Sequence, residues 1–181
     1  LKTLDSVGLE IVNLLEKDPK QLIDRYYFVQ DTPYAVPCDP SIQMLFYRKD
    51  ILEDTTIRRI LDEKYKLELK VPSTFNELNL ISEFFSKSRN PESPLLHGTC
   101  VSTGNTEIIA SEFLLSYYAD GGKLIQNSKT LALNHEIANK SLQNYMEHLK
   151  IAKNLSAKWW DESISLFAKG DIAIIIVYMN L

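Results

Sequence analysis

The apolar residues of this chain recur at two spacings, which predict two kinds of element. An apolar residue at every third or fourth position indicates an amphipathic helix, and a short run of consecutive apolar residues indicates a strand. Helices are expected at residues 1–31 (with a restart at Asp18-Pro19), 50–63, 74–89, 107–119, 134–153 and 160–169. Strands are expected at residues 34–37, 44–47, 96–102, 131–133 and 172–177.

Two of these helices carry clear start signals and a predicted buried face. Thr74 with Glu77, or Ser73 with Asn76, supplies a cap for one helix. Asn134 can cap the long helix that follows it. The first helix is expected to bury Phe75, Leu78, Ile81 and Phe85, and the second to bury Ile137, Leu142, Tyr145, Met146 and Leu149.

The strongest strand signal lies close to the C-terminal residue of the chain. Residues 172–177 form a continuous β-branched run, as in a strand buried on both faces, and Gly170 stops the helix before it. Because strands alternate with helices, the chain is predicted to be an α/β domain with a mostly parallel sheet flanked by helices. A domain seldom ends on its central strand, so we expect a fragment of a longer protein.

A polar kink separates the two predicted strands at 34–37 and 44–47. It contains Asp39, Pro40 and Ser41, and Pro37 precedes it. Proline removes a backbone donor and biases the preceding residue toward extended backbone, so a continuous helix is excluded here. Small polar groups at the junction of two strands can contact a ligand or act as a hinge, and both interpretations stay open on these residues.

A second candidate site is the loop between the predicted strand 96–102 and the following helix. Open α/β sheets bind ligands at the carboxyl ends of their strands, where loop side chains and amide donors converge. Gly104 would let the backbone approach a ligand closely, and Asn105 and Thr106 offer polar partners. The alternative interpretation is a simple cap for the helix.

Composition limits the possible functions. The net charge of −4 provides no basic field for nucleic acid. The longest apolar run, 172–179, is far shorter than the ~20 residues that span a bilayer. Aromatic residues are plentiful and suit a carbohydrate cleft. Trp160 and Phe167 fit a buried helix face, whereas Tyr178 leaves the buried strand.

Catalytic and metal-binding patterns are not found. His97, His135 and His148 lack metal-ligand spacing, and Cys38 and Cys100 are interpreted as two free thiols. Cys100 lies near His97 in sequence, but strand geometry would turn these side chains to opposite faces. No nucleophile elbow or phosphate-binding glycine loop is present, so no cofactor and no enzymatic activity are predicted.

Four segments carry a resemblance to a known family. They are Pro37-x-Asp39-Pro40-Ser41-x-Gln43-x-Leu45-Phe46-Tyr47-Arg48-Lys49-Asp50, Val71-Pro72-Ser73-Thr74-Phe75-Asn76-Glu77-Leu78, Phe113 through Gly121-Gly122-Lys123-Leu124, and Trp160 through Gly170-Asp171-Ile172-Ala173. In order and spacing they resemble segments of extracellular solute-binding proteins of sugar ABC importers, the family that includes maltodextrin-binding proteins. The likeness covers nearly the whole chain.

The resemblance implies a periplasmic-binding-protein-like lobe of type II and a division of the chain. Residues 1–43 would form an edge of the first lobe and the hinge crossing, 44–176 the second lobe, and 177–181 the return hinge strand. A sugar or oligosaccharide would bind between the lobes, and the closed form would dock on the membrane permease. The ligand-binding residues implied are Asp39, Ser41, Gln43, Gly104, Asn105, Thr106, Tyr178 and Asn180.

The same resemblance implies an extracellular or periplasmic location, with a lipoprotein anchor outside this segment. Two alternatives stay open. One is a sensory ligand-binding domain of a regulator or receptor, which shares the bilobal plan. The other is a small α/β hydrolase that uses Cys100 and His97.

Overall fold

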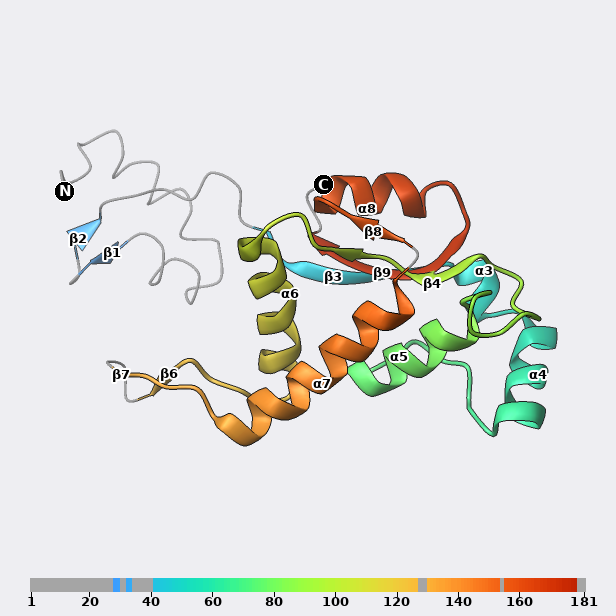
Figure 1. Cartoon of the computed structure of the whole chain (residues 1–181), viewed down its shortest axis with the longest axis horizontal. Helices are drawn as coiled ribbons and strands as arrows, with labels where there is room; N and C mark the ends of the chain where they lie inside the picture. Colours follow the sequence, from blue (N-terminus) through green and yellow to red (C-terminus); the bar gives the residue numbers. More distant parts are fainter. Residues whose placement is uncertain (1–27, 30–31, 34–40, 127–129, 154, 179–181) are drawn as a thin grey trace. The chain divides into compact units, whose positions relative to one another are not determined.

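A computed structural model describes residues 28–29, 32–33, 41–126, 130–153 and 155–178 of the chain (Figure 1). Its internal contacts divide the chain into two compact units, with the boundary between Ile42 and Gln43. No helix in the described ranges is both long and apolar enough to cross a membrane. Each unit is described by itself below.

In the first unit the described elements are two short strands. β1 (Phe28–Val29) pairs antiparallel with β2 (Thr32–Pro33), and Phe28 lies opposite Pro33. The predicted helix over residues 1–31 is therefore wrong at 28–29, because aromatic and β-branched residues there favour extended backbone. The remainder of that helix and the predicted strand at 34–37 lie outside the described residues.

The centre of the second unit is a three-stranded sheet in the order β3–β9–β4 (Figure 1). β9 (Ile172–Tyr178) is antiparallel to β3 (Gln43–Tyr47) and parallel to β4 (His97–Thr99). The sheet is thus mixed, which corrects the prediction of a mostly parallel one. The physical reason is the path of the chain: it runs into this unit along β3 and out of it along β9, so these two neighbours point in opposite directions.

The predicted single strand at 96–102 is two strands with different partners. β4 ends at Thr99, and β5 (Val101–Ser102) pairs in parallel with β8 (Ser156–Ala157). Cys100 lies between them, where the chain changes partner. A separate hairpin joins β6 (Ile125–Gln126) to β7 (Thr130–Leu131), which overlaps the predicted piece at 131–133 only in Leu131.

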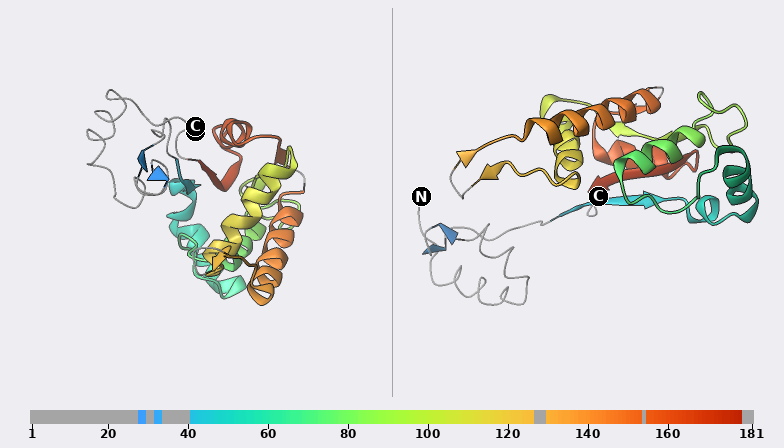
Figure 2. Two further views of the ribbon diagram at one scale, coloured as in Figure 1. Left: turned by 90° about the vertical axis from the view of Figure 1, so that its left-hand side faces the viewer. Right: turned by 90° about the horizontal axis from the view of Figure 1, so that it is seen from below.

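Helices cover both faces of the central sheet (Figures 1 and 2). α8 (Trp160–Phe167) packs on one face, where Ile175 and Val177 join its apolar residues in one core. α5 (Phe75–Phe84) contributes to the core on the other face, which includes Ile174. The prediction that this strand is buried on both faces is confirmed.

The predicted helix at 50–63 is two helices. α3 (Lys49–Leu52) is followed by its C-cap residue Glu53, and α4 (Thr55–Tyr65) begins after Asp54. The Asp54 carboxylate accepts the backbone N–H groups of Thr56 and Ile57 at 2.8 and 2.9 Å. Asp is a strong cap because its side chain satisfies donors that the first helical turn leaves free, so it starts a new helix here.

The predicted cap of α5 by Thr74 and Glu77 is confirmed, and Ser73 also takes part in it. Thr74 Oγ1 accepts the N–H of Glu77 at 3.2 Å, and the Glu77 carboxylate accepts the N–H of Ser73 at 2.8 Å. Hydrogen bonds from the backbone N–H and the hydroxyl of Ser73 lower the pKa of the Glu77 carboxyl to about 2. α5 ends at Phe84, earlier than predicted, and α6 (Thr106–Ala119) ends at the predicted glycine stop, with Gly121 at φ +88°.

The predicted inner face of α7 (His135–Ile151) is partly wrong. Tyr145 is buried, but Leu142 and Met146 are 46% and 47% exposed. The buried residues are Ala138, Ser141, Tyr145, His148 and Ile151. Fully buried Ser116 and Ser141 lie where α6 contacts α7, and their small side chains allow a close approach that turns the larger apolar residues outward.

Candidate functional site

The predicted ligand-binding residues fall into three groups. Asp39 and Asn180 lie outside the described residues, and Ser41 belongs to the first unit. The second unit contains Gln43, Tyr178 and the loop residues Gly104, Asn105 and Thr106. The sheet and the helices around it determine where these five lie relative to one another.

Gln43 and Tyr178 are brought together by strand register. They lie directly opposite each other at one end of the antiparallel pair β3–β9. The Gln43 Nε2 atom is buried and has no hydrogen-bond partner among the residues that the structure describes. A buried amide without a partner is costly, so this group is available for a further hydrogen bond.

The Tyr178 side chain is held by two helices. Its hydroxyl lies 3.2 Å from the Oγ atom of Ser111 on α6. Its ring meets that of Trp160 on α8 edge to face, with 4.7 Å between the ring centroids. Trp160 contacts the exposed ring of Trp159 in the same manner at 5.3 Å. The three rings form an aromatic cluster where β9 ends.

Trp160 is anchored by an acid that the sequence did not single out. Its indole N–H donates to the Glu112 carboxylate at 2.6 Å. Burial raises the pKa of Glu112 to about 7, and the hydrogen bond from Trp160 opposes this rise. Ser111, Glu112 and Trp160 were missed as candidates; a polar pair in an otherwise strongly apolar helix was the signal that could have identified the first two.

Gly104 is explained by the protein backbone. Its N–H donates to the Lys158 carbonyl at 3.0 Å, and the preceding N–H of Thr103 donates to the Ala157 carbonyl at 2.8 Å. A Cβ atom on Gly104 would lie 2.1 Å from the Lys158 oxygen. The close approach predicted for Gly104 is therefore made to Lys158, which ties the loop to the chain after β8.

Asn105 has the alternative role that the sequence left open. Its side-chain oxygen caps α6 by accepting the N–H of Ile108 at 2.9 Å, and Thr106 begins the helix with an exposed side chain. β5 and β8 are parallel, so the start of α6 and the start of α8 follow strands that end at one edge. Ligands of open α/β sheets bind at such an edge.

The cysteine–histidine pair that an enzyme would use is not supported. Cys100 is 4% exposed, its Sγ atom lies 3.7 Å from Ser163 Oγ, and burial raises the pKa of its thiol. A buried thiol with a raised pKa is a poor nucleophile. His97 begins β4, and no hydrogen bond joins its side chain to Cys100 among the described residues. In the described part of the chain, no three His, Cys, Asp or Glu side chains lie close enough together to bind a metal ion.

Three cavities lie in the part of the chain that the structure describes. Cavities of about 310 and 160 Å³ lie around Phe84 and Asn90, and one of about 180 Å³ lies between Leu45 and Asp120. None of these three is lined by the predicted ligand-binding residues.

Comparison with known proteins identifies the fold. No protein-family model matches the chain. Its structure is similar to the crystal structure of an ABC transporter solute-binding protein from Thermotoga lettingae TMO bound with α-D-tagatose, with a TM-score of 0.57 and 19% sequence identity. The chain has a solute-binding-protein fold. The match covers 84% of this chain but 36% of that protein, so this chain corresponds to a part of such a fold.

Proposed function

We propose that this chain is part of the substrate-binding component of an ABC transporter, which captures a sugar or oligosaccharide and delivers it to a membrane permease. The observation that supports this most strongly is the aromatic cluster at the edge where β9 ends, within a fold shared with a sugar-bound solute-binding protein. Aromatic faces and nearby hydrogen-bonding groups are the usual means of holding a sugar ring.

In this proposal the ligand contacts come from the edge described above. Tyr178 offers its ring, and Gln43 offers the amide opposite it, which has no partner among the described residues. The remaining proposed contacts are Asp39, Ser41, Gly104, Asn105, Thr106 and Asn180. Since Gly104 and Asn105 already have structural roles, their contribution would come from the shape of the loop and from the exposed start of α6.

The proposal assigns residues 44–176 to the second lobe, 1–43 to an edge of the first lobe and its hinge crossing, and 177–181 to the return strand. The adjacent ends of β3 and β9 support it, because two neighbouring crossings make a hinge about which lobes can close on a ligand. A protein of this kind works outside the cytoplasmic membrane. We further propose a maltodextrin-binding-like specificity, an anchor of the lipoprotein type, and no catalytic activity or cofactor.

The test is to titrate the chain with D-tagatose and with maltotriose and to monitor binding by ligand-observed NMR. We expect weak binding, about millimolar, because a single lobe offers one wall of the cleft. The full-length protein that contains the chain should bind a sugar at micromolar concentration or below in calorimetry. The variant Tyr178→Ala should abolish the NMR signal, and Tyr65→Ala, an exposed tyrosine on α4, should leave it unchanged. Failure of the full-length protein to bind any sugar of a broad panel would reject the proposal.

A further inference from the structure

Glu112 occupies an unusual position for an acidic side chain. It lies half-buried on α6, a helix whose residues are mostly apolar, and forms no ion pair with any residue that the structure describes. Its hydrogen-bond partner in the described ranges is the indole N–H of Trp160, at 2.6 Å. Acids in such surroundings are normally paired with a cation, so this arrangement calls for a reason.

The titratable groups around Glu112 offer it no positive charge. Tyr145 on α7 is buried, and its pKa is raised to about 12 by burial and by the charge of Glu112. Burial also raises the pKa of Cys100 between β4 and β5, and the charges of Glu112 and Glu162 add to that rise. On α8 the facing group is the neutral indole of Trp160. Burial therefore raises the pKa of Glu112 to about 7, and the single N–H donor, Trp160, only partly opposes that rise.

The same turn of α6 holds both rings of the site. Glu112 accepts the indole N–H of Trp160, while the neighbouring Ser111 contacts the hydroxyl of Tyr178. The two rings in turn meet edge to face at an interplanar angle of 86°. A change in the hydrogen bond to Glu112 thus acts on a ring that touches Tyr178.

We propose that Glu112 is a positioning residue, which sets the orientation of Trp160 against Tyr178 according to whether its carboxyl group is ionised. An ionised carboxylate accepts the indole N–H in a charge-assisted hydrogen bond, which is about twice as strong as the bond to a neutral acid. Protonation loosens Trp160 and alters the aromatic surface. The consequence for binding rests on the proposed function: the affinity for sugar should weaken as the pH falls through the pKa of Glu112.

Tryptophan fluorescence of the ligand-free chain tests the positioning role directly. Trp159 and Trp160 are the two tryptophans of the chain, and Trp159→Phe leaves Trp160 as the reporter. The emission should titrate between pH 5 and 9 with a midpoint near 7. Glu112→Gln, which keeps the size and an acceptor oxygen, should remove this transition. Glu107→Gln, an exposed acid on the same helix, should retain it. An unchanged transition in Glu112→Gln would overturn the proposal.

Binding measurements separate this inference from the proposed function. With D-tagatose or maltotriose, the Kd of the wild-type chain should rise about fivefold from pH 8 to pH 6. The Kd of Glu112→Gln should be the same at both values, with an unchanged circular dichroism spectrum. An equal pH dependence in the variant would overturn the positioning role. If no sugar binds, the proposed function fails, and the fluorescence titration alone decides the role of Glu112.

Discussion

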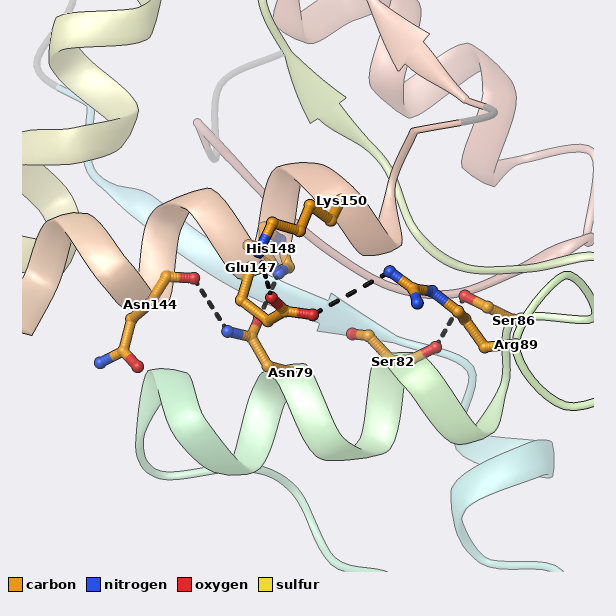
Figure 3. A network of polar contacts seen from close by, with 8 residues as sticks. All are labelled: Asn79, Ser82, Ser86, Arg89, Asn144, Glu147, His148 and Lys150. Carbon is orange, nitrogen blue, oxygen red and sulfur yellow. Dashed lines mark hydrogen bonds and ion pairs between the residues drawn. The ribbon is translucent and has the colours of Figure 1, made fainter.

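At the scale of single residues, a buried hydrogen-bond network determines the protonation state of His148. Asn79 donates its side-chain N–H to the Asn144 carbonyl at 2.9 Å, so its oxygen is the acceptor that faces His148 Nδ1 at 2.7 Å (Figure 3). His148 therefore carries its proton on Nδ1, and Nε2 is free to accept from the Thr99 hydroxyl at 3.3 Å. The network holds a neutral imidazole between α5, α7 and β4.

This histidine should make the fold sensitive to acid. Its pKa of about 4 in the folded state lies below the unfolded value of 6.5, so the unfolded chain takes up the proton first. The stabilisation is complete above pH 6.5 and is lost as the pH falls toward 4, by about 3 kcal/mol at most. Glu112, whose pKa is raised, acts in the opposite direction over part of this range, so variants must be compared.

The measurement is urea unfolding of the wild type and His148→Gln at several pH values. The difference in unfolding free energy should shrink between pH 7 and pH 4. His135→Gln, an exposed histidine at the start of the same helix, is the matched control and should show no such trend. Parallel pH profiles for the wild type and His148→Gln would contradict the prediction.

At the scale of elements, close contact between backbones determines where glycine is required. β4 lies so near α5 that a Cβ atom on Gly98 would be 1.7 Å from the Ser82 carbonyl oxygen. The Gly98 N–H donates to Ser86 Oγ at 3.0 Å, and that hydroxyl donates to the Ser82 carbonyl at 2.8 Å. Ser82 near the end of α5, Ser86 just after it and Gly98 on β4 therefore join the strand to the helix.

The substitution Gly98→Ala should force β4 away from α5 and lower the unfolding free energy by about 3 kcal/mol. Gly121→Ala is the control, because no atom lies within 4 Å of its added Cβ and only its φ of +88° is unfavourable. That variant should lose about 1 kcal/mol. Thermal unfolding by circular dichroism measures both, and similar losses for the two variants would refute the packing argument.

At the scale of the whole molecule, the second unit contains its own cores. Among the residues that the structure describes, the three clusters of buried apolar residues lie between Leu45 and Phe167 or on β9, all within the second unit. Arg48 adds a polar tie inside the unit, since it pairs with Asp50 at 2.5 Å and donates to the Gly170 carbonyl. The two turns that follow β3 and precede β9 are thereby joined.

The segment 43–181 should therefore fold alone. We expect one cooperative thermal transition within about 4 °C of that of the whole chain, since the described cores lie within this segment. Its near-ultraviolet circular dichroism should keep the aromatic signal of the cluster around Trp160 and Tyr178. A segment without a cooperative transition would show that residues 1–42 complete its core.

Features that depend on neighbouring residues could be predicted from the sequence. The caps at Thr74 and Asn134 depend on one side chain and the N–H groups next to it, and the glycine stops depend on backbone conformation at one residue. The β-branched run of β9 could be placed because only a strand buried on both faces accommodates it. The candidate ligand-binding loop at residues 103–106 could be chosen because the sequence places it between a predicted strand and a predicted helix.

Tertiary structure decided the features that join distant residues. The mixed sheet arises from the pairing of β3 with β9, and the change of partner at Cys100 arises from β8. The exposure of Leu142 was set by the small residues between α6 and α7. Trp160 and Glu112 are 48 positions apart, so no local pattern could pair them. Periodicity reports which face of a helix is apolar, whereas only packing determines which neighbour that face meets.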